Sequence, residues 1–290
     1  MTQILSLLFV ILWSSAFITS KVIVDNASPF ASLSFRFILV GLGFLLFSIY
    51  LNEKIFVKFR YIIEASLSGI LFHGLYLGGV FYSISIGLPA SISALIVSMH
   101  PILTNIFAGP ILNEKVTWKQ WIGIIFAFSG TLIVLGFDIG ETIPLLGVAA
   151  SFIALLAVTF ATIFQKKLSN RLPLSVSNFY QALGASIFLF FIMFLFEKPF
   201  ILFNYNFILS MGWQIIAVSF GAFTILMYLI KKGTASQTSN LFFLVPPISV
   251  LMAWFFLNEI ITLFDLIGLL ISTTGVYIAT TKKKKFNIQN

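Results

Sequence analysis

Apolar runs long enough to cross a bilayer recur along almost the whole chain, and only short loops separate them. A helix needs about 20 apolar residues to span the ~30 Å hydrocarbon layer. Charged residues make up only 9% of the 290 positions, whereas soluble domains carry roughly 25%. The chain is therefore expected to be an all-α integral membrane protein with no room for a soluble domain.

The apolar runs predict ten transmembrane helices. Their ranges are 3–23, 30–50, 62–83, 91–112, 119–137, 144–165, 175–195, 210–230, 236–257 and 264–281. Proline, glycine, asparagine and aspartate in the connections are typical of helix ends. The first run lacks a basic region and a small-residue cleavage site, so we expect a retained helix and not a removable signal peptide.

Lysine and arginine are concentrated on one side of the predicted bundle. If the N-terminus is cytoplasmic, fourteen of the seventeen basic residues lie in inner loops or in the C-terminal tail, as the positive-inside rule requires. They are Lys54, Lys58, Arg60, Lys115, Lys119, Lys166, Lys167, Arg171, Lys231, Lys232 and Lys282 to Lys285. This placement favours an inner (plasma) membrane protein with both termini cytoplasmic, and it argues against a nucleic-acid partner despite the net charge of +8.

The two halves of the chain resemble each other when the sequence is shifted by 145 residues. This register produces ten identities over positions 90 to 130 without a gap. It aligns Ala90-Ser91 with Ala235-Ser236, Pro101 with Pro246, Leu112-Asn113-Glu114 with Leu257-Asn258-Glu259, Thr117 with Thr262, Ile122-Gly123 with Ile267-Gly268, and Gly130 with Gly275. We therefore expect two five-helix repeats, residues 1–140 and 141–290, in one integrated transmembrane domain.

An odd number of helices in each repeat places the second repeat in the membrane upside down relative to the first. Inverted repeats of this kind are typical of secondary transporters, which bind substrate near the bilayer midplane between the halves. Alternating access uses this symmetry, because the inward-open and outward-open states are approximate mirror images. The sequence thus favours a transporter of a small-molecule substrate.

Several short motifs occur in order along the chain. They are Trp13-Ser14-Ser15-Ala16-Phe17 followed by Lys21, Pro29, Phe35-Arg36-Phe37, and two Pro…Leu-Asn-Glu segments, each followed by a glycine-spaced helix. With these motifs the sequence resembles the drug/metabolite transporter superfamily, specifically its ten-helix EamA-type branch, over essentially all 290 residues. The resemblance implies a cavity formed by helices 1, 3, 4, 6, 8 and 9, peripheral helices 5 and 10 that serve in dimer contacts, and export of amino acids or other small metabolites.

The two histidines of the chain, His73 and His100, both fall in the middle of predicted helices. Each either binds substrate or a proton, or only forms a hydrogen bond between helices. Tyr76 lies three residues after His73 and therefore shares its helix face. His100 precedes Pro101, which leaves a carbonyl of the preceding turn without a donor. His73 is the stronger candidate, and His100 is expected mainly to satisfy such a carbonyl.

Helices 1 and 2 contribute further candidates for the substrate site. Trp13 and Phe17 share one face, Ser14 adds a hydroxyl, and Trp13 lies in mid-helix although membrane tryptophans favour the interfaces. Arg36 lies about 9 Å into its helix at 1.5 Å per residue. It either extends to the outer interface or turns inward with Lys21 and attracts a substrate carboxylate or phosphate.

The second half offers polar and aromatic residues at corresponding depths. Thr159 and Phe160 fall near the midplane, and Gln181 occupies the position that the 145-residue shift gives to Arg36. Asn240 and Phe243 precede Pro246-Pro247, which must interrupt the helix. Interrupted helices at matching positions in two halves indicate a transporter's binding region, although a kink needed only for packing has the same pattern.

Glu114 and Glu259 each precede a helix by a few residues and are expected to anchor its start. Gly123, Gly130, Gly268 and Gly275 recur at seven-residue spacing on helices 5 and 10. Small residues on one face let helix backbones approach closely. They are expected to support packing within the protomer or a homodimer through helices 5 and 10.

Other functional classes fit the sequence less well. All nine carboxylates lie in loops or near helix ends, and cysteine is absent, so a midplane carboxylate relay, thiolate metal sites and cysteine nucleophiles are excluded. Neither an enzyme nor a bound metal or cofactor is expected. A facilitator or exchanger fits better than proton coupling, which would have to use the histidines. A flippase for a lipid-linked or amphipathic molecule is the alternative within transport.

Overall fold

The computed structural model describes residues 2–88, 93, 96–135, 144–257 and 261–280. Within these ranges the chain is helical, with short connections and an isolated antiparallel bridge between Ala27 and Ile201. Glu259 and Lys282 to Lys285, which carried parts of the sequence predictions, lie outside the described residues, as do the ends of several predicted segments.

Most helices begin and end close to the predicted positions, but α6 begins at His100, after a turn at Ser98–Met99. His100 is therefore at the start of its helix and not in the middle, as was expected, because proline favours the first helical position, which Pro101 occupies. The bounds of the helices are α1 (Thr2–Val24), α2 (Pro29–Tyr50), α3 (Phe59–Gly69), η1 (Ile70–Leu77), α4 (Gly78–Ser85), α6 (His100–Leu112), α7 (Trp118–Leu135), α8 (Leu145–Leu168), α9 (Leu174–Phe196), α10 (Tyr205–Trp213), η2 (Gln214–Ala222), α11 (Phe223–Lys232), α12 (Ala235–Ser239), η3 (Asn240–Leu244), α13 (Val245–Leu257) and α14 (Leu263–Thr280). Three sets follow without a break, α3–η1–α4, α10–η2–α11 and α12–η3–α13, so the described elements form ten helical rods. Seven helices in the described ranges are long and apolar enough to cross a membrane.

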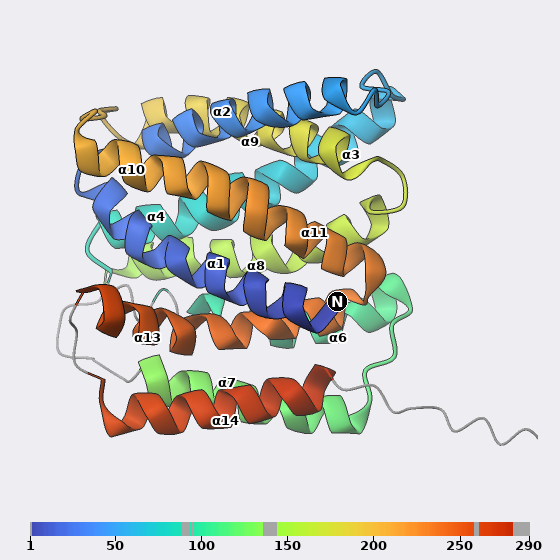
Figure 1. The fold of residues 1–290 in the computed structure, drawn as a ribbon, viewed down its shortest axis with the longest axis vertical. Helices are drawn as coiled ribbons and strands as arrows, with labels where there is room; N and C mark the ends of the chain where they lie inside the picture. Colours follow the sequence, from blue (N-terminus) through green and yellow to red (C-terminus); the bar gives the residue numbers. More distant parts are fainter. Residues whose placement is uncertain (1, 89–92, 94–95, 136–143, 258–260, 281–290) are drawn as a thin grey trace, which may run out of the picture.

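Two closely packed helix pairs lie at the ends of the long axis of the molecule. α2 lies beside α9 at one end, α7 lies beside α14 at the other, and the remaining rods fill the space between them (Figure 1). We call the side of the bundle at which α1 begins the N-terminal face, and the side at which α1 ends the opposite face. The main buried apolar cluster extends from the α7–α14 pair into the middle of the bundle, with residues from α1, η1, α8, α11 and η3 as well as from α7 and α14.

The glycines of α7 and α14 face each other inside the chain. A Cβ added to Gly275 would lie 2.2 Å from the backbone nitrogen of Ala127, and one added to Gly123 would lie 2.5 Å from that of Ala279. Gly130 is equally crowded by the backbone of α14. These glycines were expected to support packing within the protomer or a homodimer, and the structure shows the packing within the protomer.

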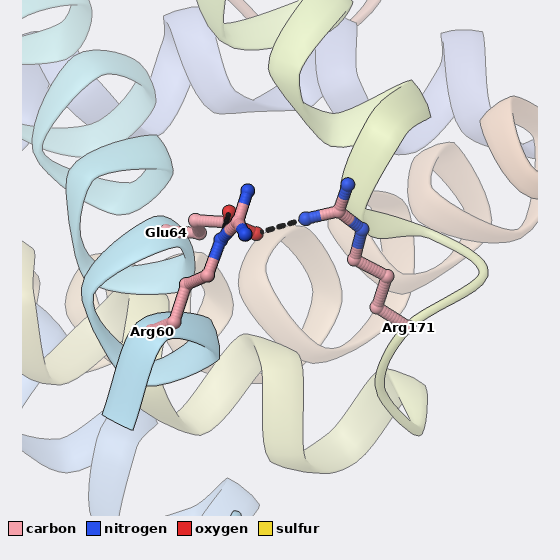
Figure 2. A network of polar contacts seen from close by, with 3 residues as sticks. All are labelled: Arg60, Glu64 and Arg171. Carbon is pink, nitrogen blue, oxygen red and sulfur yellow. Dashed lines mark hydrogen bonds and ion pairs between the residues drawn. The ribbon is translucent and has the colours of Figure 1, made fainter. Parts of the chain in front are cut away.

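An ion-pair network ties α3 to the connection between α8 and α9 on the N-terminal face. Figure 2 shows Glu64 between Arg60 and Arg171. One carboxylate oxygen lies 2.9 Å from Arg60 Nε and the other 2.5 Å from Arg171 Nη1. Exposed pairs contribute only ~0.2–1 kcal/mol each, so the network positions these elements more than it stabilises them.

Glutamates from one half cap the first helical turn of the other. Glu197, at the end of α9, accepts hydrogen bonds from the backbone N–H groups of Phe30 (3.1 Å) and Ala31 (2.7 Å) at the start of α2. Glu53, after α2, accepts a hydrogen bond from the Ser175 hydroxyl at the start of α9. A carboxylate at a helix N-terminus satisfies free donors and complements the helix dipole.

Replacement of Glu197 by alanine is expected to lower the free energy of unfolding by about 1 kcal/mol, the usual contribution of a capping side chain. Thermal unfolding of the purified protein in detergent measures this effect. Lys198→Ala is the matched control, because Lys198 is the exposed neighbour of Glu197 in the sequence. Equal midpoints for the two variants would show that the Glu197 cap contributes nothing.

Candidate functional site

Trp13 lies at the centre of a buried aromatic cluster between α1, η1 and η3. Its ring centroid is 5.5 Å from that of Phe9, 5.8 Å from Phe72 and 5.5 Å from Phe242. The indole N–H donates a hydrogen bond to the Tyr76 hydroxyl. Two of the predicted site residues, Trp13 and Tyr76, are thus in direct contact, and both are about 5% exposed.

His73 lies next to this cluster and has a free ring nitrogen. Its ring is 4.4 Å from the Phe37 ring and 4.5 Å from the Phe223 ring. Phe72 contacts both His73 and Tyr76 edge-on. Nδ1 of His73 is buried and has no hydrogen-bond partner. A purely structural role, in which His73 forms a hydrogen bond between helices, does not explain why Nδ1 has no partner. The free nitrogen favours the other expected role, binding of substrate or a proton.

Arg36 points into the bundle. The side chain is only 6% exposed, Nε donates to Ser219 Oγ at 3.0 Å, and Cζ lies 5.3 Å from the centre of the Phe37 ring. The expectation that Arg36 extends to the outer interface is therefore wrong. The alternative of an inward pair with Lys21 is wrong too, since Lys21 is exposed near the end of α1. Arg36 instead shares Phe37 with His73.

His100 satisfies the carbonyl that Pro101 leaves free. A histidine ring nitrogen donates to the backbone of Val97, four residues before the proline, which confirms the structural role expected for His100. Its other ring nitrogen, Nε2, is buried without a partner, and the ring stands edge-on to Phe242 at 4.6 Å. His100 thus joins the aromatic cluster from the side of α6.

Asn240 pairs with Asn105, which the sequence reasoning missed. Asn105 Nδ2 donates to Asn240 Oδ1 at 2.8 Å and to the Pro101 carbonyl at 2.7 Å. Both asparagines are buried, and Asn105 Oδ1 and Asn240 Nδ2 have no partner. The spacing of Asn105 four residues after Pro101 could have indicated this side chain, because it reaches a carbonyl one turn back.

The remaining candidates lie apart from this cluster or serve the backbone. Ser14 Oγ donates to the Val245 carbonyl at 3.2 Å, and Thr159 Oγ1 donates to the Leu155 carbonyl at 2.7 Å. Phe160 is 37% exposed and packs on Phe107. The side chain of Phe17 lies outside the described part.

Phe242, and not the predicted Phe243, is the aromatic residue that η3 contributes to the cluster. Its ring contacts Phe9, Trp13 and His100. Phe243 is fully buried toward Phe128 of α7. The tighter winding of the 3-10 segment rotates successive side chains by a different angle from that of an α-helix, so the faces shift by one residue.

Glu114 and Lys166 hold the corner between α11 and α12 on the N-terminal face. Glu114 accepts hydrogen bonds from the N–H of Ala235 (2.9 Å) and from the N–H and hydroxyl of Ser236 (3.1 and 2.8 Å). Lys166 Nζ donates to the carbonyls of Ile230 (2.8 Å) and Gly233 (2.5 Å). The carboxylate covers a helix start and the ammonium covers a helix end, as the helix dipole favours. We call these contacts the corner clamp.

The corner clamp corrects one expectation and explains the Leu-Asn-Glu motif. Glu114 does not anchor the helix that follows it, because Thr117 and Gln120 cap the start of α7. Asn113 ends α6 with φ of 56°, a left-handed conformation that asparagine tolerates. The chain then turns back, and the next side chain, Glu114, faces the second half of the molecule.

Three hydroxyl groups link the two halves near the opposite face. Ser93 Oγ lies 3.0 Å from Ser83 Oγ of α4 and 2.9 Å from Ser151 Oγ of α8. All three side chains are fully buried. We call this chain of hydrogen bonds the serine link. It consists of neutral groups, so each bond is weaker than the charge-assisted bonds of the corner clamp.

Two π-helical segments, η1 and η2, carry the central residues of the site. Ile70–Leu77 includes His73 and Tyr76, and Gln214–Ala222 includes Ser219. The 145-residue shift maps residues 70–77 onto 215–222, which lie within η2. π-Helical turns are rare and occur mostly at functional sites. Sequence reasoning missed both segments.

The described residues around Trp13 and His73 include neither a cluster of metal ligands nor a lining residue of the surface hollow on the opposite face. Among residues that the structure describes, no group of three or more histidine, aspartate or glutamate side chains is placed to hold a metal ion. A surface hollow of about 390 Å³ is lined by Asp25, Ser28, Ser85 and their neighbours on the opposite face. None of the predicted site residues lines it.

Comparison with known proteins identifies the family. The profile of the EamA-like transporter family matches residues 1–136 and again residues 145–281. The chain is 28% identical to "Uncharacterized transporter YvbV" of Bacillus subtilis (strain 168), over 98% of this chain and 92% of that protein. It is 23% identical to "Probable amino-acid metabolite efflux pump" of Escherichia coli (strain K12), over 95% and 93%.

The fold also matches a known one. A crystal structure with 16% sequence identity superposes with a TM-score of 0.81 and covers 96% of this chain and 97% of that chain. Together with the helices that could cross a membrane, the family match indicates a multi-pass membrane transporter and not an enzyme. The chain belongs to the EamA-like transporter family.

Proposed function

We propose that this protein is a secondary transporter that moves a small metabolite across the inner membrane by alternating access. The observation that carries the proposal is the enclosure of one buried cluster, around Trp13, Arg36 and His73, by two separate sets of contacts. The corner clamp lies on the N-terminal face and the serine link near the opposite face. Each joins the first half to the second, through Glu114 in the corner clamp and through Ser93 and Ser151 in the serine link, so either can open while the other stays closed.

The proposed mechanism includes an inverted repeat, which similarities between the two halves support. The family profile matches each half separately. The π segment of each half packs against the first two helices of the other, η1 against α8 and α9, and η2 against α1 and α2. The caps at the starts of α2 and α9 are likewise exchanged between halves. These features fit two copies of one five-helix unit, residues 1–140 and 141–290, in opposite orientations.

The proposed topology places the N-terminal face in the cytoplasm, with the C-terminus on the same side. The basic residues support it, since Arg60 and Arg171 form ion pairs at the start of α3 and after α8, and Lys166 lies near the end of α8. The start of α3 and the end of α8 lie on the N-terminal face (Figure 1). Under the positive-inside rule such loops stay inside.

Amino acids or related compounds are the proposed cargo, and export is the proposed direction. The name of the Escherichia coli relative supports this choice. The cluster suits such molecules because it combines apolar rings with unpartnered polar atoms on His73, His100, Asn105 and Asn240. Specific sites for small molecules are mostly apolar with a few well-placed polar groups.

Flux through liposomes that contain the purified protein tests the proposal. Vesicles loaded with radiolabelled L-amino acids are expected to lose label faster than protein-free vesicles, and His73→Ala together with Tyr76→Ala to slow that loss while the protein stays folded. The control variant is Phe160→Ala, since Phe160 lies outside the cluster. A protein that moves no amino acid or related metabolite but equilibrates a fluorescent lipid between leaflets would instead be a flippase, a lipid transporter.

A further inference from the structure

Arg36 carries a positive charge into the bundle without a negative partner. The described residues form ion pairs at Arg60–Glu64 and Arg171–Glu64, and Arg36 has no such partner among them. Five N–H donors are available on a guanidinium, and the hydrogen bond from Nε to Ser219 uses one of them. A buried charge within a membrane is expensive and indicates a functional site.

The corresponding position in the second half shows what a purely structural residue does there. Gln181, which the 145-residue shift aligns with Arg36, accepts from Gln165 Nε2 at 3.0 Å and donates to Ser177 Oγ at 3.1 Å. Both ends of that amide are therefore satisfied by the protein. Packing at this depth is achieved by a neutral side chain, so packing alone does not explain the arginine.

We propose that Arg36 binds the carboxylate of the transported molecule, with Ser219 and His73 beside it. This assignment rests on the proposed transport function and names the chemical group that the site selects. The guanidinium edge that Ser219 leaves free matches a carboxylate, which accepts two parallel hydrogen bonds from it. Nδ1 of His73 is a further unpartnered polar atom against the same Phe37 ring.

The presence of a single unpaired cation, Arg36, among the described residues of the site favours a carboxylate over a phosphate as its ligand. Lys21 is exposed, and Lys166 is committed to the carbonyls of the corner clamp. No second cation from the described residues joins Arg36, so a doubly charged phosphate would remain half compensated. A carboxylate group carries a single negative charge, which the single charge of Arg36 balances, and unpaired charge is costly in the low-dielectric interior.

The position of the site connects binding to the moving parts. Ser219 lies in η2, His73 lies in η1, and Arg36 comes from α2. A carboxylate held by these residues therefore bridges the π segments of both halves. The bound substrate is then in contact with the elements whose relative movement opens either face.

Chemical protection of Arg36 tests the assignment without any change at Arg36 itself. The chain has only three arginines, so the Arg60→Lys, Arg171→Lys variant keeps Arg36 as its sole arginine. Phenylglyoxal, which reacts with guanidinium groups, is added to this purified protein in detergent, and modification of Arg36 is followed by mass spectrometry. The probes are a mixture of L-amino acids with uncharged side chains, the corresponding primary amines that lack the carboxylate, and inorganic phosphate.

The amino acids are expected to slow the modification of Arg36 several-fold, and the amines and phosphate to leave it unchanged. Protection by phosphate alone, or equal rates with amino acids and amines, would overturn the carboxylate assignment. In liposomes, Arg36→Gln is expected to raise the KM for amino acids about tenfold or more, as loss of a charge-assisted pair implies, while Arg60→Gln has no effect. An unchanged KM in Arg36→Gln would contradict the carboxylate site but not the transport function. Protection of Arg36 by amino acids without any flux in liposomes would contradict the transport function but not the site.

Discussion

Replacement of Gly275 by alanine is expected to destabilise the protein strongly, because it forces two helix backbones apart. The new Cβ would lie 2.2 Å from the backbone nitrogen of Ala127 and 2.7 Å from the Gly123 carbonyl oxygen. Backbone atoms of a helix cannot rotate away as side chains do, so α7 and α14 must separate. Overpacking typically costs ~1–3 kcal/mol and more where the surroundings are rigid, and we expect a loss of about 3 kcal/mol.

Thermal unfolding in detergent measures the loss, with Gly212→Ala as the matched control. Gly212 also lies in a helix, α10, but a Cβ added there meets nothing within 4 Å. The control should unfold at the wild-type temperature or slightly above it, because alanine favours helices. If Gly275→Ala and Gly212→Ala unfold at the same temperature, α7 and α14 do not pack as described.

Removal of the Glu114 carboxylate is expected to open the N-terminal face. Glu114→Ala leaves the N–H groups of Ala235 and Ser236 and the Ser236 hydroxyl without their acceptor. Hydrogen bonds to a charged group contribute ~1.5–3 kcal/mol. A loss of about 2 kcal/mol in the closed state alone would shift the equilibrium roughly 30-fold toward opening at this face.

Labelling of a cysteine at position 238 measures this opening. Thr238 lies next to the clamped corner and is 4% exposed, and the natural chain contains no cysteine. In a Thr238→Cys background, Glu114→Ala is expected to accelerate reaction with a polar maleimide by at least tenfold. Lys115→Ala is the control, because Lys115 is the exposed neighbour of Glu114. An unchanged rate in Glu114→Ala would show that the corner clamp does not keep this face closed.

Features that depend on neighbouring residues along the chain could be predicted from the sequence. The helical rods follow the apolar runs, since length and hydropathy determine both. The contact of His100 with the Val97 backbone follows from Pro101, and the close approach of α7 and α14 follows from their glycine spacing. Each of these features depends on residues a few positions apart along the chain, so the local sequence indicates it.

Features that depend on winding or on distant partners could not be predicted. The π segments have no side-chain pattern that distinguishes them from α-helix, and the 3-10 winding of η3 exchanged Phe242 for Phe243 in the cluster. Glu114 was expected at the start of its own next helix, but its partners Ala235 and Ser236 lie in the other half. The inward direction of Arg36 likewise depends on Ser219, which is far away in sequence.

Distances between spin labels on the two faces test alternating access most directly. One pair, Lys115→Cys with Lys232→Cys, spans the corner clamp, and a second, Ser85→Cys with Leu145→Cys, spans the serine link; all four positions are exposed. In liposomes each pair is expected to show a shorter and a longer distance. Glu114→Ala should favour the longer distance in the first pair and the shorter in the second. Distances that do not respond to Glu114→Ala, or that lengthen together in both pairs, would contradict an alternating-access transporter.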